Sequence, residues 1–120
     1  MSNSRPSAKS ARLCLALSML LAAAAPALAE QDARYAAVSA LGEINGVALN
    51  CRYVDQVRRM KSAVVDNVPK ERSFGLAFDE ATNRAFLAFI REARECPGPA
   101  EMERRVDEGI DRLRTTFAPN

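Results

Sequence analysis

The N-terminus is the feature that most limits what this 120-residue chain can fold into, because it determines how much chain is left to form a core. Basic residues without an acidic neighbour open the chain, and an apolar run broken only by Ser18 follows over residues 13–25. Pro26 is expected to end this helical stretch, and Ala27-Leu28-Ala29 matches the small-x-small pattern that signal peptidase reads. We therefore expect a cleavable signal peptide at residues 1–29, cut between Ala29 and Glu30, and a single helical domain over residues 30–120.

Two other interpretations of this segment are weaker. A membrane-spanning helix needs about 20 apolar residues, and this run is about 13 residues long. A lipoprotein signal would use Cys14, but Arg12 lies too close before it for a good lipobox. We expect Cys14 to be discarded with the signal, and the exported protein to lack a stable membrane anchor after cleavage. The expected location is the periplasm.

Removal of the signal changes the charge of the protein. Three of its 17 basic residues precede Glu30, whereas all 15 acidic residues lie from Glu30 onward. The chain after the cut therefore carries 14 basic and 15 acidic residues. A nearly neutral surface of mixed sign has no electrostatic footprint for nucleic acid, so we expect no nucleic-acid partner.

Two cysteines, Cys51 and Cys96, remain after the cut. Exported proteins pass into compartments where disulfides persist, and two cysteines allow one intramolecular pairing. The bond would close a loop of about 45 residues, which in the chain-entropy model stabilises the fold by roughly 4 kcal/mol. That is a large contribution for a domain of this size, because a small core supplies only a few kcal/mol.

Apolar residues recur at helical spacing through the whole domain, without the alternation of a strand or a hairpin signal. Helices are expected over residues 32–49, 52–67 and 71–95 (from Glu71 or Ser73), and from Pro99 to about Phe117. The third helix holds four of the five phenylalanines, so we expect it at the centre of the core. The predicted fold is all-α, a small four-helix bundle stapled by one disulfide.

Each expected helix has an apolar face. The faces of the first two helices comprise Ala37, Leu41, Ile44 and Ala48, then Val54, Val57, Met60, Val64 and Val68. Those of the last two comprise Phe74, Phe78, Ala81, Ala85, Phe89 and Ala93, widened by Phe86 and Ile90, then Met102, Val106, Ile110, Leu113 and Phe117. Gly42 and Gly46 lie one turn apart, which predicts close contact with a neighbouring helix. A membrane-surface role for the last helix is an alternative, but acidic residues mix with basic ones on its polar face.

The sequence offers little for catalysis. It contains no histidine, which excludes His-based metal sites and nucleophile–histidine systems. It also contains no phosphate-binding loop and no dinucleotide fingerprint. We expect no enzyme activity, no cofactor and no metal site.

The densest polar cluster is Asp79, Glu80, Asn83 and Arg84. Carboxylates beside an amide can bind a cation or polarise a substrate. At helical spacing, however, Glu80 and Arg84 first predict an ordinary i, i+4 ion pair. Asn83 borders the apolar stripe and is expected to be partly buried, which makes it the first residue to mutate.

The order of residues along the domain resembles a family of small exported helical proteins of proteobacteria whose function is uncharacterised. The residues that carry the resemblance are Leu41-Gly42, Cys51, Arg58, Met60, Pro69, Arg72, Phe78, Asn83-Arg84, Phe86, Phe89, Cys96, Ala100 and Glu108-Gly109. Val57 departs from the pattern, which has a tryptophan there. The resemblance implies a helical body with the disulfide and implies no activity. In layout alone the chain also resembles the HdeA-type periplasmic acid chaperones.

The function expected from the sequence is a non-enzymatic factor that binds another periplasmic or envelope protein, as a chaperone-like, inhibitory or accessory protein. In the acid-chaperone version, protonation of the 15 carboxylates would leave a charge near +14 and loosen the bundle. The alternative is a small-ligand carrier or an enzyme with a pocket inside the bundle, lined by the third-helix phenylalanines and Asn83. The oligomeric state does not follow from the sequence.

Overall fold

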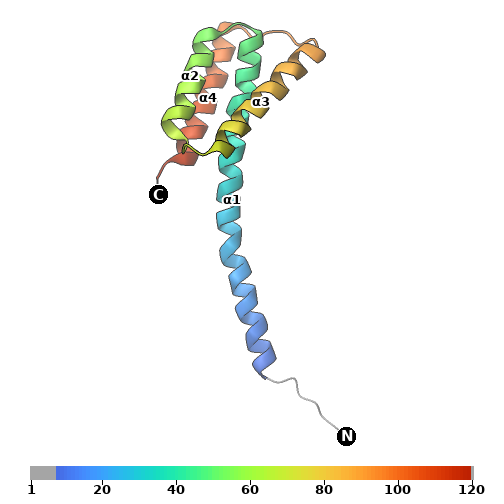
Figure 1. Ribbon diagram of the computed structural model, residues 1–120, viewed down its shortest axis with the longest axis vertical. Helices are drawn as coiled ribbons and strands as arrows, with labels where there is room; N and C mark the ends of the chain where they lie inside the picture. Colours follow the sequence, from blue (N-terminus) through green and yellow to red (C-terminus); the bar gives the residue numbers. More distant parts are fainter. Residues whose placement is uncertain (1–7, 120) are drawn as a thin grey trace. The chain divides into compact units, whose positions relative to one another are not determined.

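The computed structural model describes the backbone of residues 8–119 and the side chains of residues 25–119. It consists of α1 (Ala8–Asn50), α2 (Val54–Asn67), α3 (Arg72–Arg91) and α4 (Pro99–Phe117), without a strand in these residues (Figure 1). A disulfide joins Cys51 to Cys96. The predicted all-α four-helix fold with one disulfide is therefore confirmed.

The chain divides into two compact units, with the boundary between Asp32 and Ala33. In the first unit, α1 continues through Pro26, so the expectation that this proline ends the helix is wrong. A proline inside a helix removes one backbone hydrogen bond, but the alanines and leucines around it are among the strongest helix formers. The cut after Ala29 remains a prediction.

The second unit contains a core built from α1, α2 and α4 together with the start of α3. Its buried residues are Ala37, Val38, Leu41, Ala48, Val57, Met60, Ala63, Val68, Phe74, Phe78, Met102, Val106, Ile110 and Leu113. Helices α2 and α4 lie side by side. The predicted apolar face of α4 is buried as expected, whereas that of α2 is rotated: Ala63 is buried and Val54 is 61% exposed.

Helix α3 is not the centre of this core, which corrects the prediction. Figure 1 shows it crossing α1, with its C-terminal end pointing away from the α2–α4 pair. Its phenylalanines face α1 over the first half of the helix, where Phe74 and Phe78 are buried. Further along, Phe89 is still buried, but Phe86 is half-buried and Ile90 is 58% exposed. Four phenylalanines in one helix indicated a central position, but the helix contacts the bundle by one face only.

The glycine pair of α1 lies at this crossing, as predicted. A Cβ atom on Gly42 would lie 2.7 Å from the Phe78 carbonyl oxygen, and one on Gly46 would lie 2.5 Å from that of Thr82. The two helices therefore approach each other backbone to backbone. Beside the glycines, the buried Asn45 donates a hydrogen bond from Nδ2 to Thr82 Oγ1 at 3.2 Å.

Three aromatic rings lie together where α1, α3 and α4 meet. The Phe74 ring lies 4.8 Å from that of Tyr35 and 5.3 Å from that of Phe117, centroid to centroid. The Arg34 guanidinium lies over Phe117, 5.4 Å from the ring centre. These contacts attach the start of α3 and the end of α4 to α1.

Helices α1 and α3 end in the same way. Tyr53 N–H donates to Ala48 O and Arg94 N–H donates to Phe89 O, the hydrogen bonds of a Schellman motif. The left-handed position of each motif is held by a residue other than glycine, Arg52 at φ 58° and Ala93 at φ 47°. α3 therefore ends at Arg91, four residues before the predicted end. The reversal brings the following segment back toward α1.

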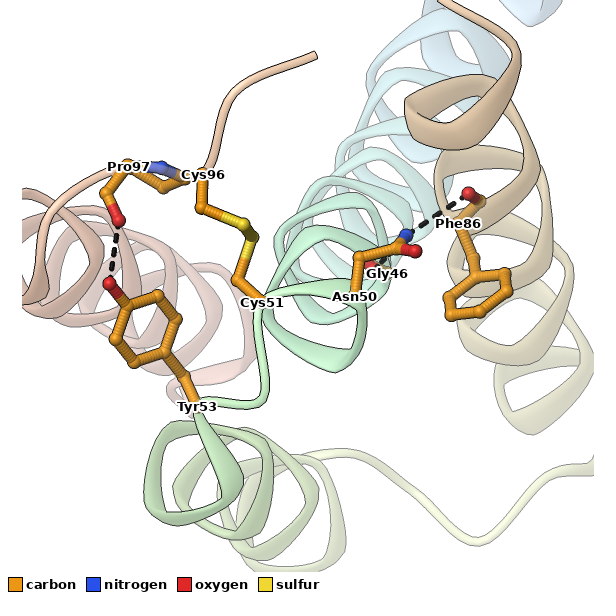
Figure 2. Close-up of a disulfide and its surroundings, with 7 residues drawn as sticks. All are labelled: Gly46, Asn50, Cys51, Tyr53, Phe86, Cys96 and Pro97. Carbon is orange, nitrogen blue, oxygen red and sulfur yellow. Dashed lines mark hydrogen bonds between the residues drawn. A yellow bond between two sulfur atoms is a disulfide. The ribbon is translucent and has the colours of Figure 1, made fainter. Parts of the chain in front are cut away.

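The four residues after Leu49 hold this returning segment in place (Figure 2). Asn50 Nδ2 donates to the Phe86 carbonyl oxygen at 3.0 Å and Tyr53 Oη donates to the Pro97 carbonyl oxygen at 2.6 Å. Cys51, between them in the sequence, makes the disulfide to Cys96. The C-terminal half of α3 and the segment before α4 are thus attached to the α1–α2 junction at three points.

Candidate binding groove

A groove of about 390 Å³ lies between the C-terminal halves of α1 and α3 and the first turns of α4. Its apolar floor is formed by Ile44 and Val47 of α1 and by Ala85 and Ala88 of α3, with the fully buried Met102 of α4 beneath. Four charged side chains line its rim: Glu43, Arg84, Arg94 and Arg105. We name this the arginine-rimmed groove.

The groove follows from the way α3 crosses α1. Gly42 and Gly46 allow close approach at the crossing, and beyond it α3 diverges from the α2–α4 pair (Figure 1). On the side facing this opening, the apolar side chains of α3 are the small ones of Ala85 and Ala88. Because no large side chain fills the space between the helices, the side chains of α1 form an apolar floor there.

Each rim arginine is paired with a carboxylate. Arg84 lies 3.7 Å from Glu43, Arg105 donates from Nε to Glu101 at 2.9 Å, and Arg94 pairs with Glu92. All three guanidinium groups remain about half exposed. A guanidinium has five N–H donors, so one carboxylate partner leaves donors for a second carboxylate.

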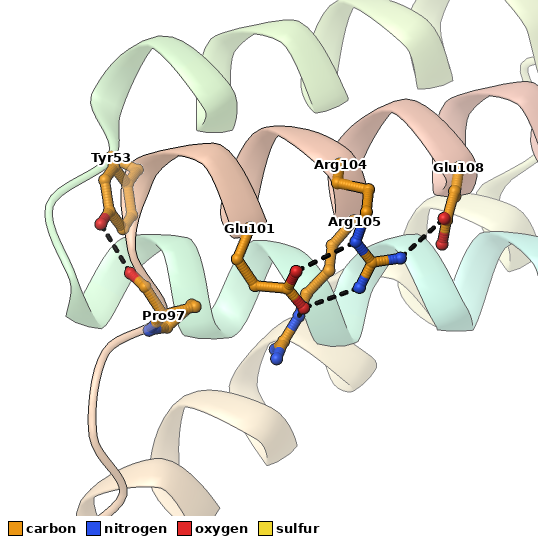
Figure 3. Close-up of polar contacts among 6 residues, drawn as sticks. All are labelled: Tyr53, Pro97, Glu101, Arg104, Arg105 and Glu108. Atoms are coloured by element: carbon orange, nitrogen blue, oxygen red, sulfur yellow. Dashed lines mark hydrogen bonds and ion pairs between the residues drawn. The ribbon is translucent and has the colours of Figure 1, made fainter.

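A network at the start of α4 sets the position of Arg105 (Figure 3). Arg104 donates to both oxygens of Glu101, at 2.7 and 3.0 Å, and also to Glu108 at 2.7 Å. The hydrogen bonds from Arg104 and then Arg105 lower the pKa of Glu101 to about 2. The Glu101 carboxylate is therefore ionised at every ordinary pH and holds Arg105 beside the groove.

A second hollow of about 250 Å³ adjoins the groove and shares Val47, Arg94 and Arg105 with it. Phe89 and Pro97 line this hollow as well. Because both hollows are lined by Arg94 and Arg105, these two arginines lie between them. The shape and composition of the two hollows suit an extended or helical segment with apolar side chains and carboxylates, because arginine binds carboxylates in a bidentate manner.

The predicted polar cluster is only partly associated with this groove. Asp79, Glu80 and Asn83 are exposed, so the expectation that Asn83 is partly buried is wrong. A helix that contacts the bundle by one face leaves its opposite face in solvent, and Asn83 lies on that face. Of the four residues, only Arg84 lines the groove, and its ion pair is with Glu43 of α1 rather than with Glu80.

The pocket expected among the phenylalanines of the third helix is not the one found. Phe74 and Phe78 pack into the core, and neither they nor Asn83 line the arginine-rimmed groove. No group of three or more histidine, cysteine or acidic side chains that could hold a metal ion occurs among the described residues.

Several residues that build the groove were missed in the sequence. Arg94 and Arg105 lie eleven positions apart, on either side of Pro97, and no short motif joins them. Asn50 and Tyr53 lie on either side of Cys51, and their hydrogen-bond acceptors, the Phe86 and Pro97 carbonyl oxygens, are 36 and 44 residues away in the sequence. The available signal was the glycine pair, which locates the helix crossing from which the groove opens.

Comparison of the chain with protein-family models, with curated proteins and with solved structures gives no match. Within residues 8–119, none of the helices combines the length and apolar character that crossing a membrane requires. The groove and the charges around it are therefore the features of the chain that bear on its function.

Proposed function

We propose that the chain is exported, cut after Ala29, and acts in the periplasm as a non-enzymatic binding protein. Its partner is another periplasmic or envelope protein, and the contact is an acidic, partly apolar segment of that partner held in the arginine-rimmed groove. The observation that carries this proposal is the open apolar floor, Ile44 and Val47, beneath three arginines.

Two further features support the proposal. The Cys51–Cys96 bond is of the kind that persists in oxidising compartments, which agrees with export. The groove walls are held by covalent and hydrogen-bonded attachments rather than by mobile loops, and a preformed site loses less entropy on binding.

The probe for this function is a random-peptide library displayed on phage, selected against the oxidised protein lacking residues 1–29. Binding of an enriched peptide is then measured by fluorescence anisotropy for the wild type and for Ala88→Trp, whose indole would fill the groove. The matched control is Lys61→Trp, at an exposed position of α2 outside the groove. Far-UV circular dichroism verifies that each variant is folded.

The expected peptides combine carboxylates with large apolar residues. Ala88→Trp should weaken their binding by at least about tenfold, a loss of roughly 1.4 kcal/mol, whereas Lys61→Trp should leave it unchanged. If Ala88→Trp is not folded, Arg105→Glu takes its place, because it reverses a rim charge on an exposed side chain. Enrichment of basic peptides, or equal binding by the groove variants and the wild type, would contradict the proposal.

A second candidate is a carrier of small apolar carboxylic acids. The groove volume of about 390 Å³ supports it, since small-molecule sites occupy about 300–1,000 Å³. Decanoate is the probe: saturable binding that Ala88→Trp abolishes, without an enriched peptide, would favour the carrier over the protein-binding role.

A further inference from the structure

Helix α3 has a second apolar face that the bundle does not cover. Leu76, Leu87 and Ile90 are 46%, 59% and 58% exposed, whereas Phe74, Phe78, Ala81 and Phe89 on the opposite side are buried. Leu76, Asn83, Leu87 and Ile90 occupy positions i, i+7, i+11 and i+14 of the helix, so they form one stripe about 21 Å long. We name this the outer stripe of α3.

The charges along the outer stripe are arranged symmetrically with its leucines. Glu80 and Arg84 lie on the same edge of the stripe, one turn apart, and both are exposed. The midpoint of Glu80 and Arg84 is residue 82, and the midpoint of Leu76 and Leu87 lies between residues 81 and 82. A two-fold axis at this point would therefore exchange the two leucines and the two charges together.

We propose that two copies of the chain pair through their outer stripes, with the α3 helices antiparallel. Leu76 of each copy then packs against Leu87 of the other, and Glu80 of each lies beside Arg84 of the other. Such an isologous contact repeats every favourable pair twice. The antiparallel orientation also sets the positive end of each helix dipole against the negative end of the other.

Charge complementarity identifies a second copy as the occupant of this face. A parallel neighbour with the same sequence in register would place Glu80 against Glu80 and Arg84 against Arg84. The antiparallel register instead places each acidic position against a basic one and each leucine against a leucine. Asn83 falls beside Glu80 of the second copy in this register and can donate a hydrogen bond to its carboxylate.

This interface goes beyond the proposed binding function and uses a surface that shares only Arg84 with the groove. The groove opens between α3 and α4, whereas the outer stripe lies on the opposite side of α3 from its buried residues. Arg84 is shared: its 3.7 Å ion pair with Glu43 leaves guanidinium donors for Glu80 of the second copy. The groove variant Ala88→Trp is expected to retain the dimer.

Sedimentation equilibrium of the oxidised protein lacking residues 1–29, which contains the whole second compact unit, tests the proposal. The wild type should dimerise with rising concentration, and Leu87→Glu should raise the dissociation constant by at least about tenfold. The matched control is Val65→Glu, at a valine of α2 that is 64% exposed. It introduces the same charge at a similarly exposed apolar position and should leave the dimer unchanged.

A charge-reversal experiment tests the antiparallel register. Glu80→Arg alone places arginine against arginine in the dimer, and Arg84→Glu alone places glutamate against glutamate, so each variant should dimerise at least about tenfold more weakly. An equal mixture of the two restores both opposite-charge contacts, and a heterodimer should form with near wild-type affinity.

Three outcomes would overturn the proposal: a monomeric wild type across the concentration range, equal effects of Leu87→Glu and Val65→Glu, or a mixture no tighter than the separate charge variants. Because all substituted positions are exposed, circular dichroism should show folded variants. The two proposals are tested separately, since peptide binding reports on the groove and sedimentation equilibrium reports on the outer stripe. Ala88→Trp should lose peptide binding and still dimerise.

Discussion

Substitution of Gly46 by alanine provides the sharpest test of the helix crossing. The added Cβ atom would lie 2.5 Å from the Thr82 carbonyl oxygen, 2.8 Å from the Ala85 Cβ atom and 2.8 Å from the Phe86 nitrogen. Two of these three atoms belong to the backbone of α3, so no side-chain rotation removes the clash. Helix α3 must move away from α1 by about 1 Å to restore ordinary contact, because unbonded carbon atoms pack about 3.5–4.0 Å apart.

The size of the effect follows from what this movement disrupts. The hydrogen bonds from Asn45 to Thr82 and from Asn50 to Phe86 span the two helices, and each contributes about 1 kcal/mol. Overpacking of a close contact costs about 1–3 kcal/mol more. Alanine recovers about 1 kcal/mol as a better helix former. We expect Gly46→Ala to lower the free energy of unfolding by about 2–4 kcal/mol.

Urea denaturation of the oxidised protein, followed by circular dichroism at the helical band, measures this change. The matched control is Gly75→Ala in α3, where an added Cβ atom has no neighbour within 4 Å. Helix propensity alone should then raise the free energy of unfolding by about 1 kcal/mol. If Gly46→Ala is as stable as the wild type, or gains as much as Gly75→Ala, the backbone-to-backbone crossing is wrong.

Three further predictions follow from the helix ends and the charges. Replacing Cys51 and Cys96 together by serine should lower the free energy of unfolding by about 4 kcal/mol, measured in urea against the oxidised wild type, and a loss below about 1 kcal/mol would show that the bond constrains little. Ala93→Gly should raise the melting temperature through a gain of about 0.5–1 kcal/mol, because alanine is strained at φ 47°, and an unchanged or lower melting temperature would argue against the left-handed turn. The pKa of Glu101 is lowered from 4.5 to about 2, so its carboxylate stabilises the folded state above pH 4.5 and loses this contribution as the pH falls through about 2. The stability difference between the wild type and Glu101→Gln should accordingly be constant above about pH 5 and vanish below about pH 2, and an NMR titration midpoint of Glu101 near 4.5 would refute the network.

The four-helix fold, the bounds of α2 and α4 and the disulfide could be predicted from the sequence, whereas the start of α1 and the end of α3 could not. Pro99 begins α4, and four buried residues with the half-buried Phe117 form its single apolar stripe, so nothing competes with that interpretation. Helix α3 is different because it is apolar on two opposite sides. Spacing identified the stripe that the bundle covers, with Phe74 and Phe78, but widened it with Ile90, which lies on the exposed side. The second stripe, with Leu76 and Leu87, was missed.

The groove could not be predicted because three separate segments of the chain form it. Val47, Ala88 and Arg105 come from different helices, and their distances depend on the angle at which α3 crosses α1. Gly42 and Gly46 predict where two helices touch, yet they do not indicate which helix the partner is or how it diverges. The polar cluster around Asn83 was conspicuous in the sequence because its residues lie within residues 79–84 of one helix, whereas the rim arginines are spread over residues 84–105.

The disulfide also changes the order in which parts of the chain are connected. Cys51 follows α1 directly and Cys96 precedes α4 by three residues, so α2 and α3 lie inside a covalent ring and α1 and α4 extend from its point of closure. Through the sulfur bridge, two helices about 50 residues apart in sequence become joined by a connection of a few residues. Their packing, Leu41 and Ile44 against Gly109, is then a local contact of a helical hairpin. Folding slows as contacts span longer stretches of chain. The oxidised protein should therefore refold faster than the reduced one, although α1 and α4 themselves lie outside the ring.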